Sequence, residues 1–255
     1  MDILQAAILG IIEGLTEFLP ISSTGHLIVV ADWLGVEATD QNIAFKVIIQ
    51  VAAIFAVVGN YSGRFHPRHF DLWLKVFIAF LPIAVIGLLF GDLIETFFVV
   101  QIVAWMFIIG GIIFLVVEHY YDEDIQPTRT MDQISMKQAG WVGFAQIFAA
   151  IPGTSRAGAT IIGGMLTGMD RKTSAEFSFL LALPVLLASS AYSLLKYYNE
   201  FADTTFVPLI VGFVISFVVA FFTMKLFLSF LERFTFRAFG IYRIIFGLLL
   251  LFWLY

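Results

Sequence analysis

Long, nearly uninterrupted apolar segments are the feature that most constrains how this chain can fold. Six such segments extend over residues 43–59, 72–91, 97–117, 175–195, 206–224 and 239–255. An α-helix needs roughly 20 apolar residues to cross the hydrocarbon core of a bilayer. A transmembrane β-barrel would instead show short segments of alternating polarity. We therefore predict six transmembrane α-helices at these positions.

The composition of the 255-residue chain agrees with this prediction. Hydrophobic residues make up 60% of the sequence and charged residues only 13%, whereas about 25% of the residues in a typical soluble domain are charged. This balance argues against a soluble enzyme, a nucleic-acid-binding protein and a disordered chain. The expected fold class is an all-α polytopic membrane protein, with one integral membrane domain over residues 1–255.

Two further apolar blocks, residues 3–31 and 139–169, are interrupted at their centres by proline, glycine and small hydroxyl residues. The first interruption contains EGLTEFLPISSTGH (residues 13–26) and the second PGTSRAGAT (residues 152–160). Proline removes a backbone hydrogen-bond donor, and non-helical backbone at membrane depth is tolerated only beside a protein-enclosed or wet cavity. We predict that each block forms a re-entrant hairpin of two half-helices. The alternative is a single kinked helix with a Ser/Thr-rich face.

The same order of elements occurs twice along the chain. A shift of 132 residues places Pro20 on Pro152 and Ser23 on Ser155. In each half, a broken hairpin is followed by three transmembrane segments. The identical letters are few, so the repeated pattern carries the argument.

This order predicts a first repeat over residues 1–125 and a second over residues 133–255. Because three crossings is an odd number, the second repeat must enter the membrane from the opposite side. The predicted architecture is therefore a pair of inverted-topology repeats.

Loop charges orient this topology. One side of the membrane receives nine basic residues and the other receives Lys196 alone. The nine are Arg64, Arg68, Arg129, Lys137, Arg171, Lys172, Lys225, Arg233 and Arg237. Cytoplasmic loops carry the excess of Lys and Arg, so the basic side is predicted to be cytoplasmic. Both termini and the mouth of the first hairpin would then face outward.

Glu13 and Glu17 are acidic residues inside an apolar block. A charged side chain in the bilayer costs at least ~2.5–3.5 kcal/mol on insertion scales, which makes it a candidate functional residue. Residues four apart share one helix face, where two carboxylates repel unless a cation, a shared proton or a basic partner joins them. We predict that Glu13 and Glu17 bind Mg²⁺ or Ca²⁺, because both ions prefer oxygen ligands. The alternative is two protonated carboxyls in a wet vestibule.

His26 and Ser23 are the candidate groups for proton transfer and nucleophilic attack. If Ser22 or Ser23 caps the second half-helix, His26 lies one turn inside it, near the depth of Glu17. Imidazole can act as a general base or acid near neutral pH. The alternative for His26 is a hydrogen-bonded core residue without a catalytic role.

Arg156 lies at the centre of the second interruption. Its planar guanidinium offers a fork of donors that suits phosphate oxygens. A structural role as counter-ion to Glu13 or Glu17 is the alternative, and the two roles are compatible because an Arg can pair with a carboxylate until substrate arrives.

The two second half-helices are expected to begin at residues 22–24 and 154–156. Their free N–H groups and positive dipole ends would form an anion site at the membrane midplane. The predicted phosphate-binding residues are Ser22, Thr24, Gly25, Gly153, Thr154, Ser155 and Arg156. Together with two Glu, Ser23 and His26, this arrangement suits transfer of a phosphoryl group.

The motifs at residues 13–26 and 152–160 resemble the two signature motifs of the undecaprenyl-diphosphate phosphatase family of the bacitracin-resistance type. The resemblance extends along the whole chain. It implies an enzyme of a bacterial-type inner (plasma) membrane that removes the terminal phosphate of a C55 isoprenoid diphosphate. The monophosphate product would be recycled as the lipid carrier for peptidoglycan and other envelope polymers. The active site is expected to open to the outer, periplasmic face.

The resemblance also implies roles for single residues. It assigns the acidic motif to Glu13 and Glu17, the Ser-Thr-Gly-His stretch to residues 23–26, and phosphate binding to Arg156, with a divalent cation required. Either Ser23 attacks the phosphorus after activation by His26, or His26 activates a water molecule. The expected partners are a polyprenyl diphosphate and the bilayer, with no nucleic acid, and a homodimer is left open. The alternative function is an inverted-repeat secondary transporter or a lipid flippase that uses the same site.

Overall fold

The computed structural model describes residues 1–37, 39–196 and 206–253. Within these ranges the regular structure is helical, apart from one isolated bridge between Thr128 and Met169. The α-helices are α1 (Ile3–Thr16), α2 (Ser23–Trp33), α3 (Asp40–Asn60), α4 (Phe70–Glu95), α5 (Val100–Tyr120), α6 (Met136–Gln146), α7 (Arg156–Leu166), α8 (Arg171–Lys196), α9 (Phe206–Leu231) and α10 (Arg237–Trp253). The short 3₁₀ helices are η1 (Ser62–Phe65), η2 (Pro67–His69), η3 (Met131–Gln133) and η4 (Ile147–Ala150).

Five helices in the described part are long and apolar enough to cross a membrane. They are α3, α4, α5, α8 and α9, and each overlaps one of the predicted transmembrane segments. This finding confirms the all-α polytopic class. The sixth prediction, residues 239–255, overlaps α10, which has 17 residues. Its last two residues, 254 and 255, lie outside the described residues.

Each of the two interrupted blocks forms a pair of separate helices. In the first block α1 is followed by a break at residues 17–22 and then by α2, and the two helices pack against each other. In the second block α6 and η4 precede a break at residues 151–155, after which α7 packs back on α6. The alternative of one continuous kinked helix is therefore wrong for both blocks.

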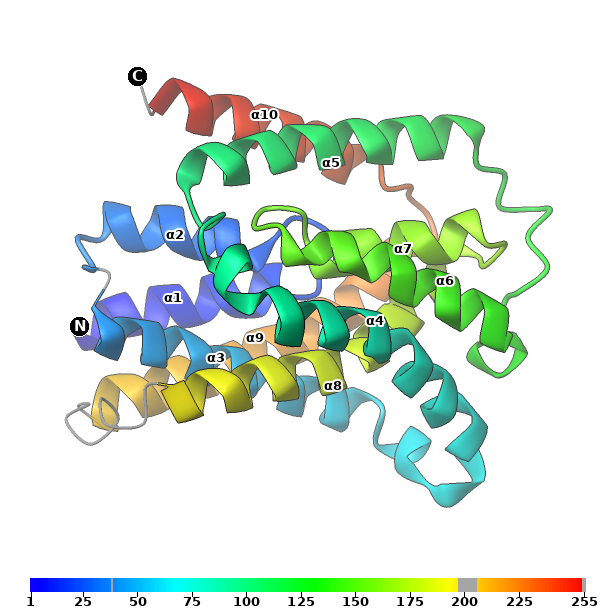
Figure 1. Cartoon of the computed structure of the whole chain (residues 1–255), viewed down its shortest axis with the longest axis horizontal. Helices are drawn as coiled ribbons and strands as arrows, with labels where there is room; N and C mark the ends of the chain where they lie inside the picture. The colour runs from blue at the N-terminus through cyan, green and yellow to red at the C-terminus, as the bar shows by residue number, and fades with distance from the viewer. Residues whose placement is uncertain (38, 197–205, 254–255) are drawn as a thin grey trace.

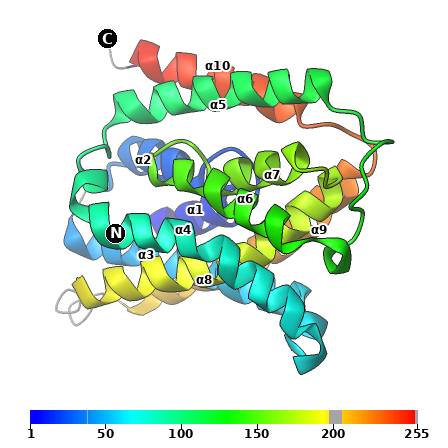
Figure 2. The same cartoon turned by 45° about the vertical axis from the view of Figure 1, so that its right-hand side comes forward.

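The two helix pairs enter the bundle from opposite ends. In Figures 1 and 2 the α1–α2 pair comes from the end where the chain begins, and the α6–α7 pair comes from the other end. Both breaks lie near the middle of the bundle. The connections at residues 61–69 and 121–135 lie at the end opposite the N-terminus, whereas α10 ends on the N-terminal side (Figure 1).

Small residues let α1 pack closely on α9. A Cβ atom added at Gly10 would lie 2.7 Å from the carbonyl oxygen of Gly212, and one added at Gly14 would lie 2.7 Å from that of Ser216. Helices in membranes commonly approach each other through such small residues at four-residue spacing. This contact holds α1 inside the bundle, so that Glu13 and Glu17 become buried.

The two breaks share an unusual backbone conformation at the residue that precedes the second helix. Ser22 caps α2 with φ 70° and ψ 97°, and Ser155 caps α7 with φ 72° and ψ 113°. These positions are 133 residues apart, so the shift of 132 is wrong by one at the caps. The reason is that one residue separates Pro20 from Ser22, whereas two residues separate Pro152 from Ser155.

Candidate active site

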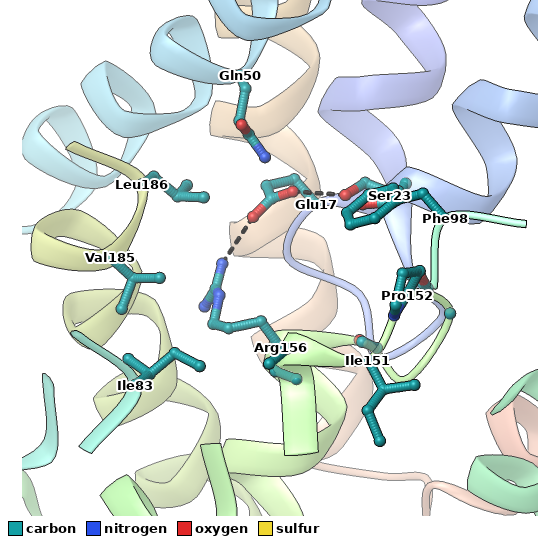
Figure 3. Close-up of a pocket in the computed structure, with 16 residues that line it drawn as sticks. Glu17, Ser23, Gln50, Ile83, Phe98, Ile151, Pro152, Arg156, Val185 and Leu186 are labelled. Atoms are coloured by element: carbon teal, nitrogen blue, oxygen red, sulfur yellow. Dashed lines mark hydrogen bonds and ion pairs between the residues drawn. The ribbon is translucent and has the colours of Figure 1, made fainter. Parts of the chain in front are cut away.

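A cavity of about 140 Å³ lies where the two breaks meet. Figure 3 shows its lining side chains, which come from segments far apart in the sequence. The residues that line it are Glu17, Ser22, Ser23, Thr24, Gln50, Ile83, Phe98, Ala149, Ala150, Ile151, Pro152, Gly153, Ser155, Arg156, Val185 and Leu186. Its polar side chains therefore gather at two helix starts, and its other walls are mainly apolar.

An ion pair between Glu17 and Arg156 joins the two breaks. The Nη2 atom of Arg156 lies 2.8 Å from Oε1 of Glu17, and the two side chains are only 11% and 5% exposed. The second terminal nitrogen, Nη1, donates to the carbonyl oxygen of Ser178 at 3.0 Å. The predicted contact between the first and second motifs is confirmed. The guanidinium is held from two sides at the wall of the cavity.

Ser23 donates its hydroxyl hydrogen to the other carboxylate oxygen of Glu17, at an Oγ–Oε2 distance of 2.6 Å (Figure 3). Glu17 thus contacts Arg156 with one oxygen and Ser23 with the other. A carboxylate at hydrogen-bonding distance from a hydroxyl can accept its proton during nucleophilic attack. The amide of Gln50 on α3 also points toward Glu17 (Figure 3).

The starts of α2 and α7 both border the cavity through their capping residues. The Oγ atom of Ser155 accepts a hydrogen bond from the N–H of Gly158 at 3.0 Å, whereas Ser22 makes no side-chain cap. The first N–H groups of a helix have no partner within it and carry partial positive charge. Gly153, with φ 91°, adopts a backbone conformation that favours glycine. Two helix starts therefore offer donors to an anion in one cavity.

His26 lies one turn inside α2, but its imidazole is not part of the cavity lining. Nδ1 lies 2.7 Å from the carbonyl oxygen of Ser22, and Nε2 lies 2.5 Å from the hydroxyl of Tyr242 on α10. Because a carbonyl only accepts, Nδ1 carries the hydrogen, and a neutral ring then accepts from Tyr242 through Nε2. The ring also stacks on Phe246. The Ser23 hydroxyl donates to Glu17 and not to His26.

Glu13 is completely buried one turn before Glu17, and it does not line the cavity either. Neither of its carboxylate oxygens has a hydrogen-bond partner in the described part of the chain. A buried polar atom without a partner calls for an explanation, such as a catalytic role, a bound water molecule or a bound ion. Among the residues that the structure places, no group of three or more His, Cys, Asp or Glu side chains is assembled. A cation held here would therefore need oxygen ligands from substrate or water in addition to Glu13 and Glu17.

Two more predicted phosphate-binding residues lie away from the lining. Gly25 faces α5, where an added Cβ would collide with the ring of Phe107. The Oγ1 atom of Thr154 is buried without a partner among the described residues. The cavity thus contains Glu17, Ser22, Ser23, Thr24, Gly153, Ser155 and Arg156 of the predicted set, whereas Glu13, Gly25, His26 and Thr154 lie outside its lining.

Sequence reasoning missed Tyr242 and Arg243. Tyr242 contacts His26, and Arg243 is fully buried between the two breaks. The available signal was an Arg inside a predicted transmembrane segment, which is costly and therefore a candidate for function. A single such residue can also be tolerated when it faces protein, so the sequence alone does not separate the two cases.

The chain is similar to known proteins along almost its whole length. The chain is 61% identical over 251 residues to the undecaprenyl-diphosphatase of a Sulfurovum species, and the match covers 98% of this chain and 99% of that protein. It is 60% identical over 251 residues to undecaprenyl-diphosphatase 2 of Pseudoalteromonas translucida, covering 98% of both chains. It is also 49% identical to the undecaprenyl-diphosphatase of Methanococcus aeolicus, again covering 98% of both.

A family model described as bacitracin resistance protein BacA matches residues 6–249. This range contains both breaks and every residue that lines the cavity. The chain therefore belongs to the bacitracin resistance protein BacA family, as the resemblance of its two motifs predicted.

Proposed function

We propose that this chain is an undecaprenyl-diphosphate phosphatase, which hydrolyses the C55 isoprenoid diphosphate to its monophosphate and inorganic phosphate. The names of the full-length relatives support the substrate and the reaction. The observation that carries the proposal is the contact of Glu17 with both Ser23 and Arg156 at a cavity bordered by two helix starts. Recycling of the monophosphate for peptidoglycan and other envelope polymers follows from the same proposal.

Arg156 and the two helix starts are the proposed phosphate-binding groups. Arginine binds phosphate oxygens through two parallel N–H donors, and helix N-termini attract anions through free N–H groups. When substrate enters, Arg156 exchanges its contact with Glu17 for contacts with phosphate, which leaves the Glu17 carboxylate able to accept a proton. Such fixed donors stabilise the charge that develops on the phosphoryl oxygens in the transition state.

Ser23 is the proposed nucleophile, and Glu17 is the nearest group that can receive its proton. The Ser23 Oγ–phosphorus bond forms, the bond from phosphorus to the bridging oxygen breaks, and the lipid monophosphate leaves. Water then attacks the phosphoserine, which releases phosphate and restores the hydroxyl. In the competing route Glu17 or His26 activates a water molecule directly. In the route through Ser23, His26 contributes by donating a hydrogen bond from Nδ1 to the carbonyl oxygen of Ser22.

Glu13 and Glu17 are the proposed residues for a divalent cation, Mg²⁺ or Ca²⁺. The unpartnered, fully buried carboxylate of Glu13 one turn from Glu17 supports this assignment. When bound, the cation would supply positive charge to neutralise the diphosphate. Oxygen ligands from two carboxylates, phosphate and water fit both ions.

The proposed membrane arrangement is a pair of inverted-topology repeats with re-entrant hairpins, in a bacterial-type inner membrane. The entry of the two helix pairs from opposite ends supports it (Figure 1). The basic connections at residues 61–69 and 121–135 would face the cytoplasm. Both termini and the mouth of the cavity would face outward, with the isoprenoid tail leaving sideways into the bilayer. A homodimer is compatible with this arrangement and is not required by it.

Phosphate release from undecaprenyl diphosphate by the purified chain in detergent tests the function. Release that depends on added Mg²⁺ or Ca²⁺ is the expected result. Binding of the lipid without release of phosphate would contradict it and favour a transporter or flippase, whose folds also use broken helices at the membrane midplane.

A further inference from the structure

Arg243 of α10 is fully buried, and its guanidinium contacts both breaks at once. Its Nη1 atom donates to the carbonyl oxygen of Pro20 at 3.0 Å. Its Nη2 atom donates to the carbonyl oxygens of Gly153 at 3.0 Å and Met106 at 2.9 Å. Pro20 belongs to the first break, Gly153 to the second and Met106 to α5. One side chain therefore connects the two breaks to the pair of helices that packs over them.

This guanidinium is held by carbonyl oxygens rather than by a carboxylate. No acidic side chain in the described part of the chain forms an ion pair with Arg243. Arg is almost never fully buried unless it is paired, because removing its charge from water costs free energy. An apolar side chain would fill the same space without this penalty. The position therefore calls for a role beyond packing.

The two carbonyls that Arg243 binds occupy equivalent positions in the two breaks, relative to the capping serine. Pro20 precedes the capping residue Ser22 by two positions, and Gly153 precedes Ser155 by two positions. Both serines have φ near 70°, a region that non-glycine residues rarely adopt. Such a strained conformation persists only where the surroundings enforce it. The hydrogen bonds from Arg243 supply a restraint of this kind to both turns.

We propose that Arg243 is a positioning residue for the phosphatase reaction. By holding the carbonyls of Pro20 and Gly153 it fixes the two capping turns, and these turns carry Ser23 and Arg156 toward Glu17. Arg243 does not line the cavity, so it acts through the backbone and not on the substrate. The inference rests on the proposed phosphatase function and adds a residue to it.

The geometry requires arginine in particular. Two different terminal nitrogens, Nη1 and Nη2, donate to the carbonyl oxygens of Pro20 and Gly153. The planar guanidinium can therefore bind both carbonyls at the same time. The compact ammonium of lysine cannot occupy both nitrogen positions. On α5, a Cβ at Gly110 would collide with the guanidinium. Glycine at this position therefore leaves the space that the side chain needs.

Two variants test the proposal by different means. Arg243→Lys keeps the charge and removes the fork, whereas Gly110→Ala keeps Arg243 and displaces its guanidinium. Arg237→Lys, at an exposed position on the same helix, is the matched control. Displacement of catalytic groups by about 1 Å can cost roughly 100-fold in rate. We expect Arg243→Lys to lower kcat about 100-fold, Gly110→Ala to lower it less, and the control to match wild type.

A distance measurement reports the position of the two hairpins independently of activity. The chain contains no Cys, so the pair Asp32→Cys and Leu166→Cys introduces unique sites for spin labels. Both residues are exposed, one on α2 and the other on α7. The wild-type background should give one narrow distance distribution. Arg243→Lys should broaden or shift it, and Arg237→Lys should leave it unchanged.

The outcomes separate this inference from the proposed function. If the wild-type chain releases no phosphate, the function fails, and the distance measurement still tests whether Arg243 holds the hairpins. If Arg243→Lys does not fold, Gly110→Ala decides by the same two readouts. An unchanged distance distribution in the deciding variant would overturn the proposal, whether kcat falls or stays at the wild-type value.

Discussion

Glu17 and Arg156 are 139 residues apart in the sequence and 2.8 Å apart in the structure. The contact joins the break of the first helix pair to the start of α7 in the second. It places a carboxylate, a guanidinium and the Ser23 hydroxyl at one cavity. Neither helix pair alone contains this set, so the site exists only because the two halves of the chain pack together.

The variant Glu17→Gln removes the charge and keeps the shape of the side chain. It should lower kcat by about 10²–10⁴-fold, because a general base contributes a factor of this size. Phosphate release and a melting curve on the same purified sample provide the measurement. Glu37→Gln, an exposed position in the α2–α3 connection, is the control. Turnover of Glu17→Gln within a few fold of wild type would exclude Glu17 from the reaction.

Ser23→Ala distinguishes the covalent route from direct attack by water. If Ser23 is the nucleophile, rapid quenching with labelled substrate should trap a phosphoserine on the wild-type chain. The variant should then form no adduct and lose turnover. Substantial turnover in Ser23→Ala without an adduct on any residue would support the water route instead. An adduct on His26 would contradict both assignments.

Removal of divalent cation by a chelator should abolish phosphate release, and added Mg²⁺ or Ca²⁺ should restore it. Glu13→Gln should raise the cation concentration for half-maximal activity by at least ~10-fold, since even outer-shell partners of a metal contribute that much. Glu95→Gln, an exposed carboxylate paired with Lys196, is the control. An unchanged cation requirement in Glu13→Gln would remove Glu13 from the metal site.

A second buried ion pair should contribute to stability without contributing to catalysis. Glu118, only 1% exposed, binds Arg171 through both carboxylate oxygens at 2.9 and 2.6 Å, and it accepts the N–H of Phe236 at 2.8 Å. Removal of one partner of a buried pair typically costs about 3–5 kcal/mol. Glu118→Ala should lower the unfolding temperature markedly.

The exposed pair of Lys172 and Glu232 provides the control for this prediction. Exposed ion pairs contribute little to folding stability. The unfolding temperature of Glu232→Ala should therefore be close to that of wild type. Equal unfolding temperatures of Glu118→Ala and wild type would show that the buried pair does not stabilise the contact between α5 and α8. The kcat of the folded fraction should be unchanged in both variants.

The sequence was sufficient to predict most of the framework. Proline, glycine and hydroxyl residues inside long apolar blocks indicated the two broken helix pairs, because few other structures tolerate such residues at membrane depth. The two half-helix starts were expected to form one anion site beside Glu17, and Arg156 was considered as a counter-ion to Glu13 or Glu17; the structure pairs it with Glu17. These inferences depend on composition along the chain and need no knowledge of side-chain direction.

Side-chain direction was harder to predict. His26 was expected beside Ser23, yet its ring stacks on Phe246 and contacts Tyr242, which lies 216 residues away. The one-residue difference in spacing between the two breaks was invisible in an alignment based on Pro20 and Pro152. The partners of Arg243 are backbone carbonyls, and carbonyls occur at every position, so no motif identifies them.

A double-mutant cycle on Glu17 and Arg156 tests the central claim most directly. The kcat/KM for phosphate release is measured for wild type, Glu17→Gln, Arg156→Lys and the double variant, with folding checked for each. If the two residues act as one unit, the kcat/KM of the double variant should be only slightly lower than that of the less active single variant. The reason is that effects within a catalytic unit are strongly non-additive. Losses that simply multiply would mean that the two residues act independently and would contradict the account.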